Sequence, residues 1–219
     1  MNRIIFIHGF GEKENIFANI APAIGGNQLL LNIWNEIGNE KIPNLNVVNF
    51  SQQLVDKYQI TANDVVIGHS MGGWIAHHIK ALTGSKIIQL ASWTHFDRVV
   101  SPINNIKIVA WLVRNGLYIN GFQKWLFVRA YKGKPSEKIF TETFTDLING
   151  NKQNIINQLT LILEPVPVLN TSPDLRIHAK KDTVIRYPKE PCHEVPGDHF
   201  TLITHPETVI EPILAFLKN

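Results

Sequence analysis

Short apolar runs alternate along this chain with segments whose apolar residues recur at helical spacing. The runs predict buried strands, at residues 3–8, 28–33, 64–67, 86–91, 175–179 and 192–196. The amphipathic segments predict helices, at residues 16–24, 46–58, 71–82 and 206–217, whereas the polar residues 34–44 predict a loop. Strands separated by helices pair in parallel through right-handed crossovers. The pattern therefore predicts an α/β fold with about six parallel strands flanked by helices.

The alternation stops between residues 95 and 168. This segment instead carries helical, aromatic-rich stretches, at residues 106–117, 121–130, 135–149 and 151–163. A helical insertion that follows the carboxyl end of a strand lies over the edge of the sheet where ligands bind. We therefore expect a single domain over residues 1–219, with a helical cap inserted at 95–168. Trp93, Trp111 and Trp125 are candidates to line a substrate pocket, although aromatic residues at helical spacing are also typical of plain core.

The composition is that of an ordinary globular protein. The apolar fraction is 44% and the charged fraction is 18%, and a chain of 219 residues suits one core better than two. The sequence contains no run of about 18 apolar residues, the length that crossing a bilayer requires. The apolar run at residues 4–7 is too short for a signal peptide. We therefore expect a cytoplasmic protein without membrane association. Cys192 is the only cysteine, so it cannot form an intramolecular disulfide.

Positive charge is concentrated in the expected cap. The whole chain has a formal net charge of +3, which is too small to indicate binding to nucleic acid. Between residues 95 and 165, nine lysines and arginines outnumber five aspartates and glutamates. Such an excess can steer an acidic substrate toward an entrance, although it is also typical of a solvated helical surface. An acidic acyl carrier is therefore a candidate partner.

The most informative stretch joins the third predicted strand to the helix that follows it. It has the pattern Gly-x-Ser-x-Gly over residues 68–72, the spacing of a nucleophile elbow. In such a turn the serine backbone is strained, and the glycines avoid side chains that would clash. The serine hydroxyl is then exposed at the carboxyl end of a strand, beside the positive end of a helix. Ser70 is therefore the candidate nucleophile.

A serine nucleophile requires a base and an acid, and two residues much later in the chain can supply them. Asp182 lies in the loop after the predicted strand at 175–179, and His199 lies in a turn after the last predicted strand. Because the carboxyl ends of parallel strands meet at one edge of a sheet, we expect both side chains near Ser70. Asp198 is a rival acid, but side chains adjacent in sequence rarely face the same group. Asp182 is therefore preferred.

Glycines also end the first predicted strand, in the stretch His8-Gly9-Phe10-Gly11. They free the backbone to turn toward a ligand. We expect the N–H groups of Phe10 and Met71 to form an oxyanion hole, the alternative being a simple turn from strand to helix. The histidines show no spacing typical of metal ligands, so no metal or other cofactor is expected.

Together these motifs resemble those of the α/β-hydrolase-fold serine hydrolases, over nearly the whole chain. The resemblance rests on the loop at 8–11, the elbow at 68–72 and the turn at 197–200. The family order of nucleophile, acid and histidine is matched by Ser70, Asp182 and His199. The resemblance implies the α/β-hydrolase fold with a catalytic triad. Since the chain begins at what resembles the third strand of the family, a small sheet is expected.

The resemblance implies cleavage of a small-molecule carboxylic ester or thioester through an acyl-enzyme on Ser70. Family members with the same triad also hydrolyse carbon–carbon bonds or transfer acyl groups, so these reactions stay open. A binding module on a hydrolase scaffold is a third interpretation, since fold does not determine function. The basic cap makes the chain similar to the pimeloyl-acyl-carrier-protein methyl esterases, for which the substrate is linked to an acidic carrier.

Overall fold

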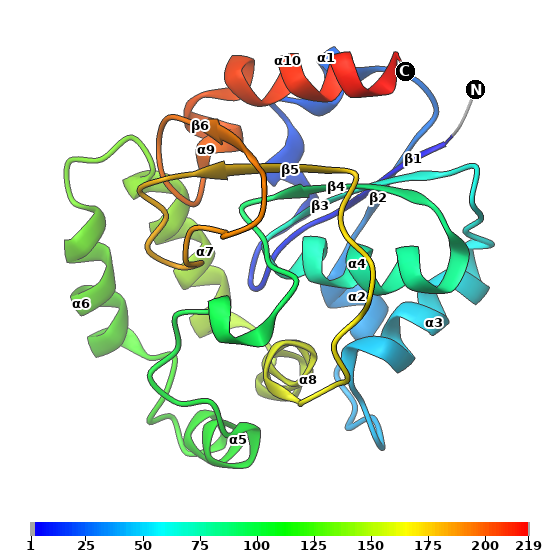
Figure 1. Ribbon diagram of the computed structural model, residues 1–219. Helices are drawn as coiled ribbons and strands as arrows, with labels where there is room; N and C mark the ends of the chain where they lie inside the picture. Colours follow the sequence, from blue (N-terminus) through cyan, green and yellow to red (C-terminus); the bar gives the residue numbers. More distant parts are fainter. Residues whose placement is uncertain (1–2, 219) are drawn as a thin grey trace.

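The core of the protein is a parallel sheet of six strands (Figure 1), in a computed structural model that describes residues 3–218. The strands are β1 (Ile4–Ile7), β2 (Gln28–Leu31), β3 (Val65–His69), β4 (Lys86–Leu90), β5 (Leu175–Ala179) and β6 (His193–Val195). Their order in the sheet is β2-β1-β3-β4-β5-β6, and every neighbouring pair is parallel. The predicted α/β fold with about six parallel strands is confirmed. Positions 1, 2 and 219 of the expected domain lie outside the described residues.

Helices cover both faces of this sheet (Figure 1). One face packs against α2 (Ile33–Ile37), α3 (Val47–Tyr58) and α4 (Met71–Thr83). The other packs against η1 (Glu14–Phe17), α1 (Ala21–Ile24), α9 (Thr201–Thr204) and α10 (Pro206–Leu217). Side chains of β1 alternate between the two cores: Ile5 enters the first and Phe6 the second. Because both faces are buried, the strands are continuously apolar, which is why apolar runs locate them.

The segment between β4 and β5 is helical. It contains η2 (Phe96–Arg98), α5 (Ile106–Arg114), α6 (Gly121–Tyr131), α7 (Glu137–Asn149) and α8 (Lys152–Leu163). α5 packs on α8, and α6 packs on α7 at the side of the molecule toward which β5 points (Figure 1). Within residues 3–218, no helix combines the length and the apolar character that crossing a bilayer would require.

Two predictions for the first quarter of the chain are wrong. The helix predicted over residues 16–24 is instead the separate helices η1 and α1, because Pro22 in the first turn of α1 cannot donate the hydrogen bond that a continuing helix needs. The loop predicted at 34–44 contains α2, which Asn32 caps by accepting a hydrogen bond from the N–H of Asn35 at 3.1 Å. Since Asn32 caps the start of α2, β2 ends at the residue before it, Leu31.

Candidate active site

Ser70 stands in the tight turn between β3 and α4. Its backbone angles are φ 51° and ψ −121°, a conformation that costs a residue with a side chain on the order of 1–3 kcal/mol. The turn is held by the next strand: the N–H of Ser70 donates to the carbonyl of Leu90 at 2.9 Å. The hydroxyl of Ser92 donates to the carbonyl of Ser70 at 2.7 Å. These bonds fix the strained turn at the carboxyl edge of the sheet.

The glycines around Ser70 are required by close packing. A Cβ atom on Gly72 would lie 1.9 Å from the carbonyl oxygen of Ile7 in β1. A Cβ atom on Gly68 would lie 2.3 Å from the carbonyl group of Gly72. Both distances are far inside van der Waals contact. The start of α4 therefore crosses β1 with no room for a side chain, which gives the motif its glycines.

Replacing Gly72 with alanine should lower the free energy of unfolding by about 3 kcal/mol or more. The added methyl group meets backbone atoms of β1, which cannot rotate away. Chemical denaturation followed by circular dichroism measures the loss. Gly121→Ala is the matched control, because a Cβ atom there meets nothing within 4 Å. Equal losses for the two variants would contradict the steric explanation.

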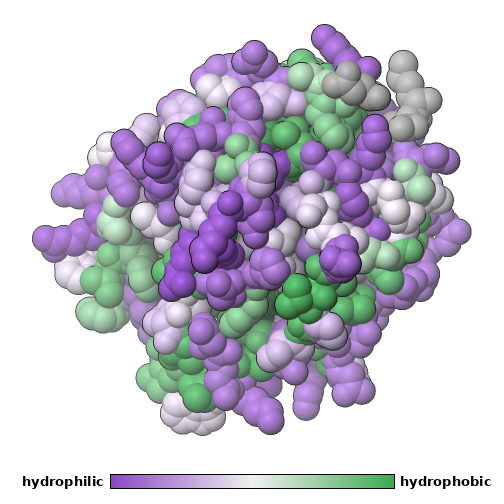
Figure 2. Space-filling model, in the orientation of Figure 1, coloured by the Kyte–Doolittle hydropathy of each residue, from purple (hydrophilic) through white to green (hydrophobic). Residues whose placement is uncertain are grey.

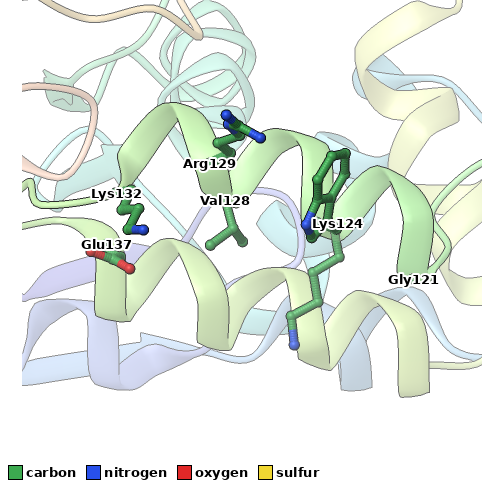
Figure 3. Close-up of a pocket in the computed structure, with 7 residues that line it drawn as sticks. Gly121, Lys124, Val128, Arg129, Lys132 and Glu137 are labelled. Atoms are coloured by element: carbon green, nitrogen blue, oxygen red, sulfur yellow. The ribbon is translucent and has the colours of Figure 1, made fainter.

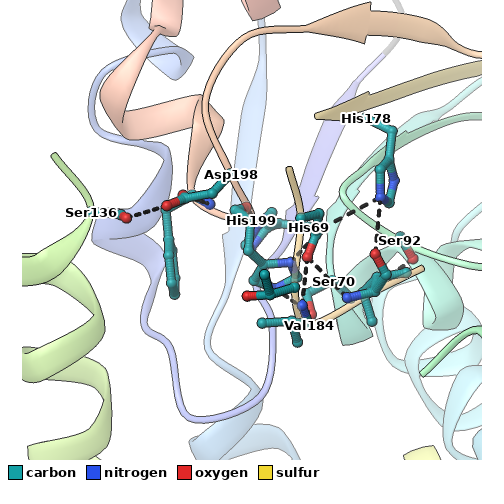
Figure 4. Close-up of polar contacts among 12 residues, drawn as sticks. His69, Ser70, Ser92, Ser136, His178, Val184, Asp198 and His199 are labelled. Carbon is teal, nitrogen blue, oxygen red and sulfur yellow. Dashed lines mark hydrogen bonds and ion pairs between the residues drawn. The ribbon is translucent and has the colours of Figure 1, made fainter. Parts of the chain in front are cut away.

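Ser70, His199 and Asp182 form one row of hydrogen bonds, of which Figure 4 labels Ser70 and His199. Nε2 of His199 lies 3.0 Å from Oγ of Ser70, and Nδ1 of His199 lies 2.8 Å from Oδ2 of Asp182. Asp182 follows β5 and His199 follows β6, so parallel strands deliver all three residues to one edge. The side chains of Asp182 and His199 are 0% and 4% exposed. The row has the geometry of an activated serine with its base and its acid.

The carboxylate of Asp182 is held by several donors. Oδ1 accepts from the N–H groups of Val184 at 2.8 Å and Ile185 at 2.9 Å, while Nε2 of His178 lies 3.5 Å from Oδ2. Burial raises the pKa of Asp182, but the charge and hydrogen bond of His199 and the other donors outweigh burial and leave that pKa below its ordinary value. The ionised carboxylate keeps the proton of the His199 ring on Nδ1.

Asp198 makes different contacts, although it adjoins His199. Its Oδ2 accepts a hydrogen bond from the hydroxyl of Ser136, which precedes α7 (Figure 4). Its Oδ1 accepts from the N–H of Phe200 at 3.1 Å. These bonds tie the turn that carries His199 to the cap, and they leave the His199 ring to Asp182. The geometry thus favours Asp182 as the acid.

The loop after β1 lies against the nucleophile. A Cβ atom on Gly9 would lie 2.8 Å from Cβ of Ser70, so the backbone of this loop touches the serine side chain. Met71 is the first residue of α4, where an N–H group has no partner within the helix. Within residues 3–218, neither the N–H of Phe10 nor that of Met71 donates a hydrogen bond to another group of the protein. Both are available donors beside Ser70.

Glu12 is absent from the residues that the sequence predicts for the site. Its buried carboxylate accepts from the N–H of Gly9 at 2.6 Å and lies 2.8 Å from Nδ1 of His69. Nε2 of His69 in turn lies 2.9 Å from the carbonyl oxygen of His199. The two ring nitrogens of His69 therefore contact the carboxylate of Glu12 and the backbone of His199. The signal in the sequence was a carboxylate directly after the loop at residues 8–11.

The pair of Glu12 and His69 connects the three loops of the site. Burial raises the pKa of Glu12, whereas the charge and hydrogen bond of His69 lower it. The effect of His69 is the larger, so the pKa lies below its ordinary value and the carboxylate is ionised. The ligand atoms of Glu12, His69 and His199 lie within 4.8 Å of one another, a distance at which side chains can share a metal ion. A metal would have to break the hydrogen bonds just described. The hydrogen bonds of Glu12 and His69 therefore indicate a structural role for the pair and not the binding of a metal ion.

Neither a protein-family model nor a curated protein matches this sequence, whereas solved structures match it closely in fold. The hydrolase olei00960 from Oleispira antarctica is 12% identical with a TM-score of 0.74, over 100% of this chain and 92% of that one. The enol-lactonase from Burkholderia xenovorans LB400 is 14% identical with a TM-score of 0.71, over 100% and 92%. A thermophilic esterase from Thermogutta terrifontis is 16% identical with a TM-score of 0.69, over 100% and 90%.

This protein has the α/β-hydrolase fold. The expectation drawn from its motifs is thereby confirmed at the level of the fold. The elbow of an α/β-hydrolase fold lies at the carboxyl edge of the sheet, which is where β3 delivers Ser70.

The three tryptophans expected to line a pocket lie apart in this α/β-hydrolase fold. Trp93 is buried at 2% exposure and stacks on Trp74, with 6.1 Å between ring centroids. Trp111 and Trp125 are 57% and 58% exposed, so neither lines an enclosed pocket. The reason is the packing of the cap, since α5 rests on α8 and α6 rests on α7, which leaves both rings on free faces.

The pH dependence of any reaction at Ser70 follows from the surroundings of His199. Burial lowers the pKa of His199, but the charge and hydrogen bond of Asp182 and the charges of Glu12 and Asp198 raise it above its ordinary value of 6.5. His199 must be neutral to accept the proton of Ser70. We therefore expect kcat/KM to rise with pH through a pKa above 6.5. An acid limb centred below that value in the wild type would contradict this expectation.

Proposed function

We propose that this protein is a serine hydrolase that cleaves a carboxylic ester or thioester through an acyl-enzyme on Ser70. The observation that carries the proposal is the row of hydrogen bonds from Asp182 through His199 to Ser70. Solved structures with the same fold include proteins described as a hydrolase, an esterase and an enol-lactonase. An ester or a lactone presents the carbonyl carbon that a serine nucleophile attacks.

In the first half of the proposed reaction, Oγ of Ser70 attacks the carbonyl carbon while Nε2 of His199 takes the hydroxyl proton. Asp182 stabilises the imidazolium that forms. The N–H groups of Phe10 and Met71 donate to the negatively charged oxygen of the tetrahedral intermediate. The intermediate then collapses, its C–O or C–S bond breaks, and the leaving alcohol or thiol takes the proton from His199.

In the second half, water replaces the leaving group. Nε2 of His199 takes a proton from the water molecule, and the resulting hydroxide oxygen adds to the acyl carbon. The new tetrahedral intermediate releases the carboxylic acid as the bond to Oγ of Ser70 breaks. His199 returns its proton to Oγ, which restores the starting enzyme. The pair of Glu12 and His69 holds the carbonyl of His199 and the N–H of Gly9 throughout both halves.

The proposal is tested by covalent labelling together with hydrolysis of p-nitrophenyl esters from acetate to decanoate. We expect a fluorophosphonate probe to modify Ser70, as located by peptide mass spectrometry, and the optimum chain length to measure the acyl site. The Ser70→Ala variant controls for labelling elsewhere. A folded wild type that neither reacts with the probe nor cleaves any ester would overturn the proposal. Acyl transfer to an added alcohol, in place of hydrolysis, would assign the same triad to a transferase.

A further inference from the structure

Exposed apolar side chains are concentrated on the part of the cap formed by α5 and α6. Of the eleven large apolar residues exposed within residues 3–218, seven lie between positions 108 and 127. These seven are Ile108, Trp111, Leu117, Phe122, Trp125, Leu126 and Phe127. Figure 2 shows apolar surface over α6 at the left edge of the molecule and over α5 below it. An apolar surface of this extent on a protein indicates a binding partner.

The packing of α6 explains why these side chains are free. One side of the helix rests on α7, where Tyr131 stacks on Phe140 with 4.0 Å between ring centroids. Phe122 and Trp125 instead stack on each other at 6.1 Å and are 70% and 58% exposed. Because α6 carries apolar residues on all its sides, packing against α7 cannot cover them. The outer side of the helix is left apolar.

Cations surround this apolar surface, and the same segment contains no acid. From residue 99 to residue 136 the sequence has six lysines and arginines and no aspartate or glutamate. The six are Lys107, Arg114, Lys124, Arg129, Lys132 and Lys134. Between α6 and α7 lies an open groove of 670 Å³ (Figure 3), in which Lys124, Arg129 and Lys132 lie beside the apolar Trp125 and Val128. Glu137 lines the same groove, and its carboxylate accepts a hydrogen bond from the N–H of Gly133 at 2.7 Å.

We propose that the surface formed by α5 and α6 docks on a lipid surface that carries anionic headgroups. Tryptophan, phenylalanine and leucine side chains enter the boundary between headgroups and acyl chains, while lysine and arginine side chains contact phosphates. The surface presents both kinds of side chain on two helices that follow each other in the sequence. The expectation of no membrane association rests on the absence of a spanning segment, whereas docking of this kind requires only a surface.

Charge argues against a second copy of the chain as the occupant. Two copies related by a twofold axis present the same patch to each other. Their cations would then face one another, and Glu137 is the single acid beside Lys124, Arg129 and Lys132 among the residues that line the groove. An acidic protein complements the cations, but it must also present an apolar surface that matches the exposed aromatic side chains. A lipid surface satisfies both features.

The docking surface adjoins the candidate active site. α6 ends at Tyr131, whose hydroxyl lies 3.3 Å from Oγ1 of Thr183, the residue after Asp182. The hydroxyl of Ser136 then bonds Asp198 beside His199. An ester dissolved in the lipid would therefore reach the protein at the cap, a consequence that rests on the proposed function. The docking itself does not, so Ser70→Ala should bind lipid as the wild type does.

Sedimentation with vesicles tests the docking. We expect the wild-type protein to bind phosphatidylcholine vesicles that contain about one third phosphatidylglycerol, with a blue shift of tryptophan fluorescence. Binding should weaken with added salt and with pure phosphatidylcholine. The double variant Lys124→Glu, Lys132→Glu should reduce the partition coefficient at least about 30-fold. Phe122→Ser with Trp125→Ser should reduce it about tenfold or more.

The controls make the same kinds of change, from apolar to serine and from lysine to glutamate, elsewhere on the surface. Leu82 on α4 is 42% exposed, and Lys218 after α10 is exposed, so Leu82→Ser and Lys218→Glu should bind vesicles as the wild type does. Thermal denaturation verifies that every variant is folded. The proposal would be overturned if the wild-type protein did not sediment with anionic vesicles. It would also be overturned if the cap variants and the controls bound vesicles equally well. Binding to an acidic carrier protein without binding to vesicles would reassign the surface to that carrier.

Discussion

Replacing Ser70 with alanine is expected to lower kcat for ester hydrolysis about 10⁶-fold. The hydroxyl of Ser70 is the group that faces Nε2 of His199, at 3.0 Å. The nearby hydroxyl of Ser92 donates to the backbone of Ser70 instead, so it cannot take over as nucleophile. Steady-state hydrolysis of the preferred p-nitrophenyl ester measures the loss.

Ser92→Ala is the matched control for this variant. It removes one hydroxyl from the same turn, at a cost in stability of about 1 kcal/mol, but it leaves the row from Asp182 to Ser70 in place. We expect it to keep kcat within about tenfold of the wild type. If Ser70→Ala kept a hundredth of wild-type activity or more, another residue would have to be the nucleophile.

The fold could be predicted because its sequence signals arise from local constraints. A strand buried on both faces must be apolar at successive positions, as in β1 and β3. The elbow must contain glycine wherever a Cβ atom would meet backbone, as at Gly72. The short helix α2 gave no such signal, because five residues do not establish a helical period and its formation depends on the cap at Asn32.

The members of the hydrogen-bonded row could be predicted from the elbow motif, the residue types and the topology together. Asp182 and His199 follow neighbouring parallel strands, and the carboxyl ends of such strands meet at one edge. Glu12 could not be found in this way, because its partner His69 is 57 positions away and the contact depends on the packing of two loops. The sequence does not show that this carboxylate is buried, and only a buried charge requires a partner of this kind.

The exposure of Trp111 and Trp125 could not be predicted from the sequence either. A helix with one apolar stripe shows which side it buries, but α6 mixes apolar and polar residues around all its sides and gives no such direction. Trp125 can therefore face a pocket, a core or the outside with the same sequence pattern. The structure places it outside, at 58% exposure. Trp125 therefore lies on the surface that we propose docks on lipid, and its role as a pocket residue stays a prediction.

Replacing Asp182 with asparagine is expected to lower kcat about 10⁴-fold while leaving the fold intact. Asparagine has nearly the same shape, and its carbonyl oxygen can still accept from the N–H groups of Val184 and Ile185. Its amide nitrogen then faces Nδ1 of His199 and donates to it, which moves the ring proton to Nε2. A ring with its proton on Nε2 cannot accept the proton of Ser70. Loss of the carboxylate charge should also move the acid limb of kcat/KM to lower pH, since that charge helps to raise the pKa of His199.

The matched control is Asp198→Asn, the same change at the adjacent acid. Because Asp198 bonds Ser136 and the N–H of Phe200 rather than the His199 ring, we expect this variant to keep kcat within about tenfold of the wild type. Its acid limb should move less than that of Asp182→Asn, since Asp198 acts on His199 by charge alone and Asp182 acts by charge and a hydrogen bond. If Asp198→Asn were the inactive variant, Asp198 would be the acid of the triad, and the 2.8 Å contact between Asp182 and His199 would not describe the working site.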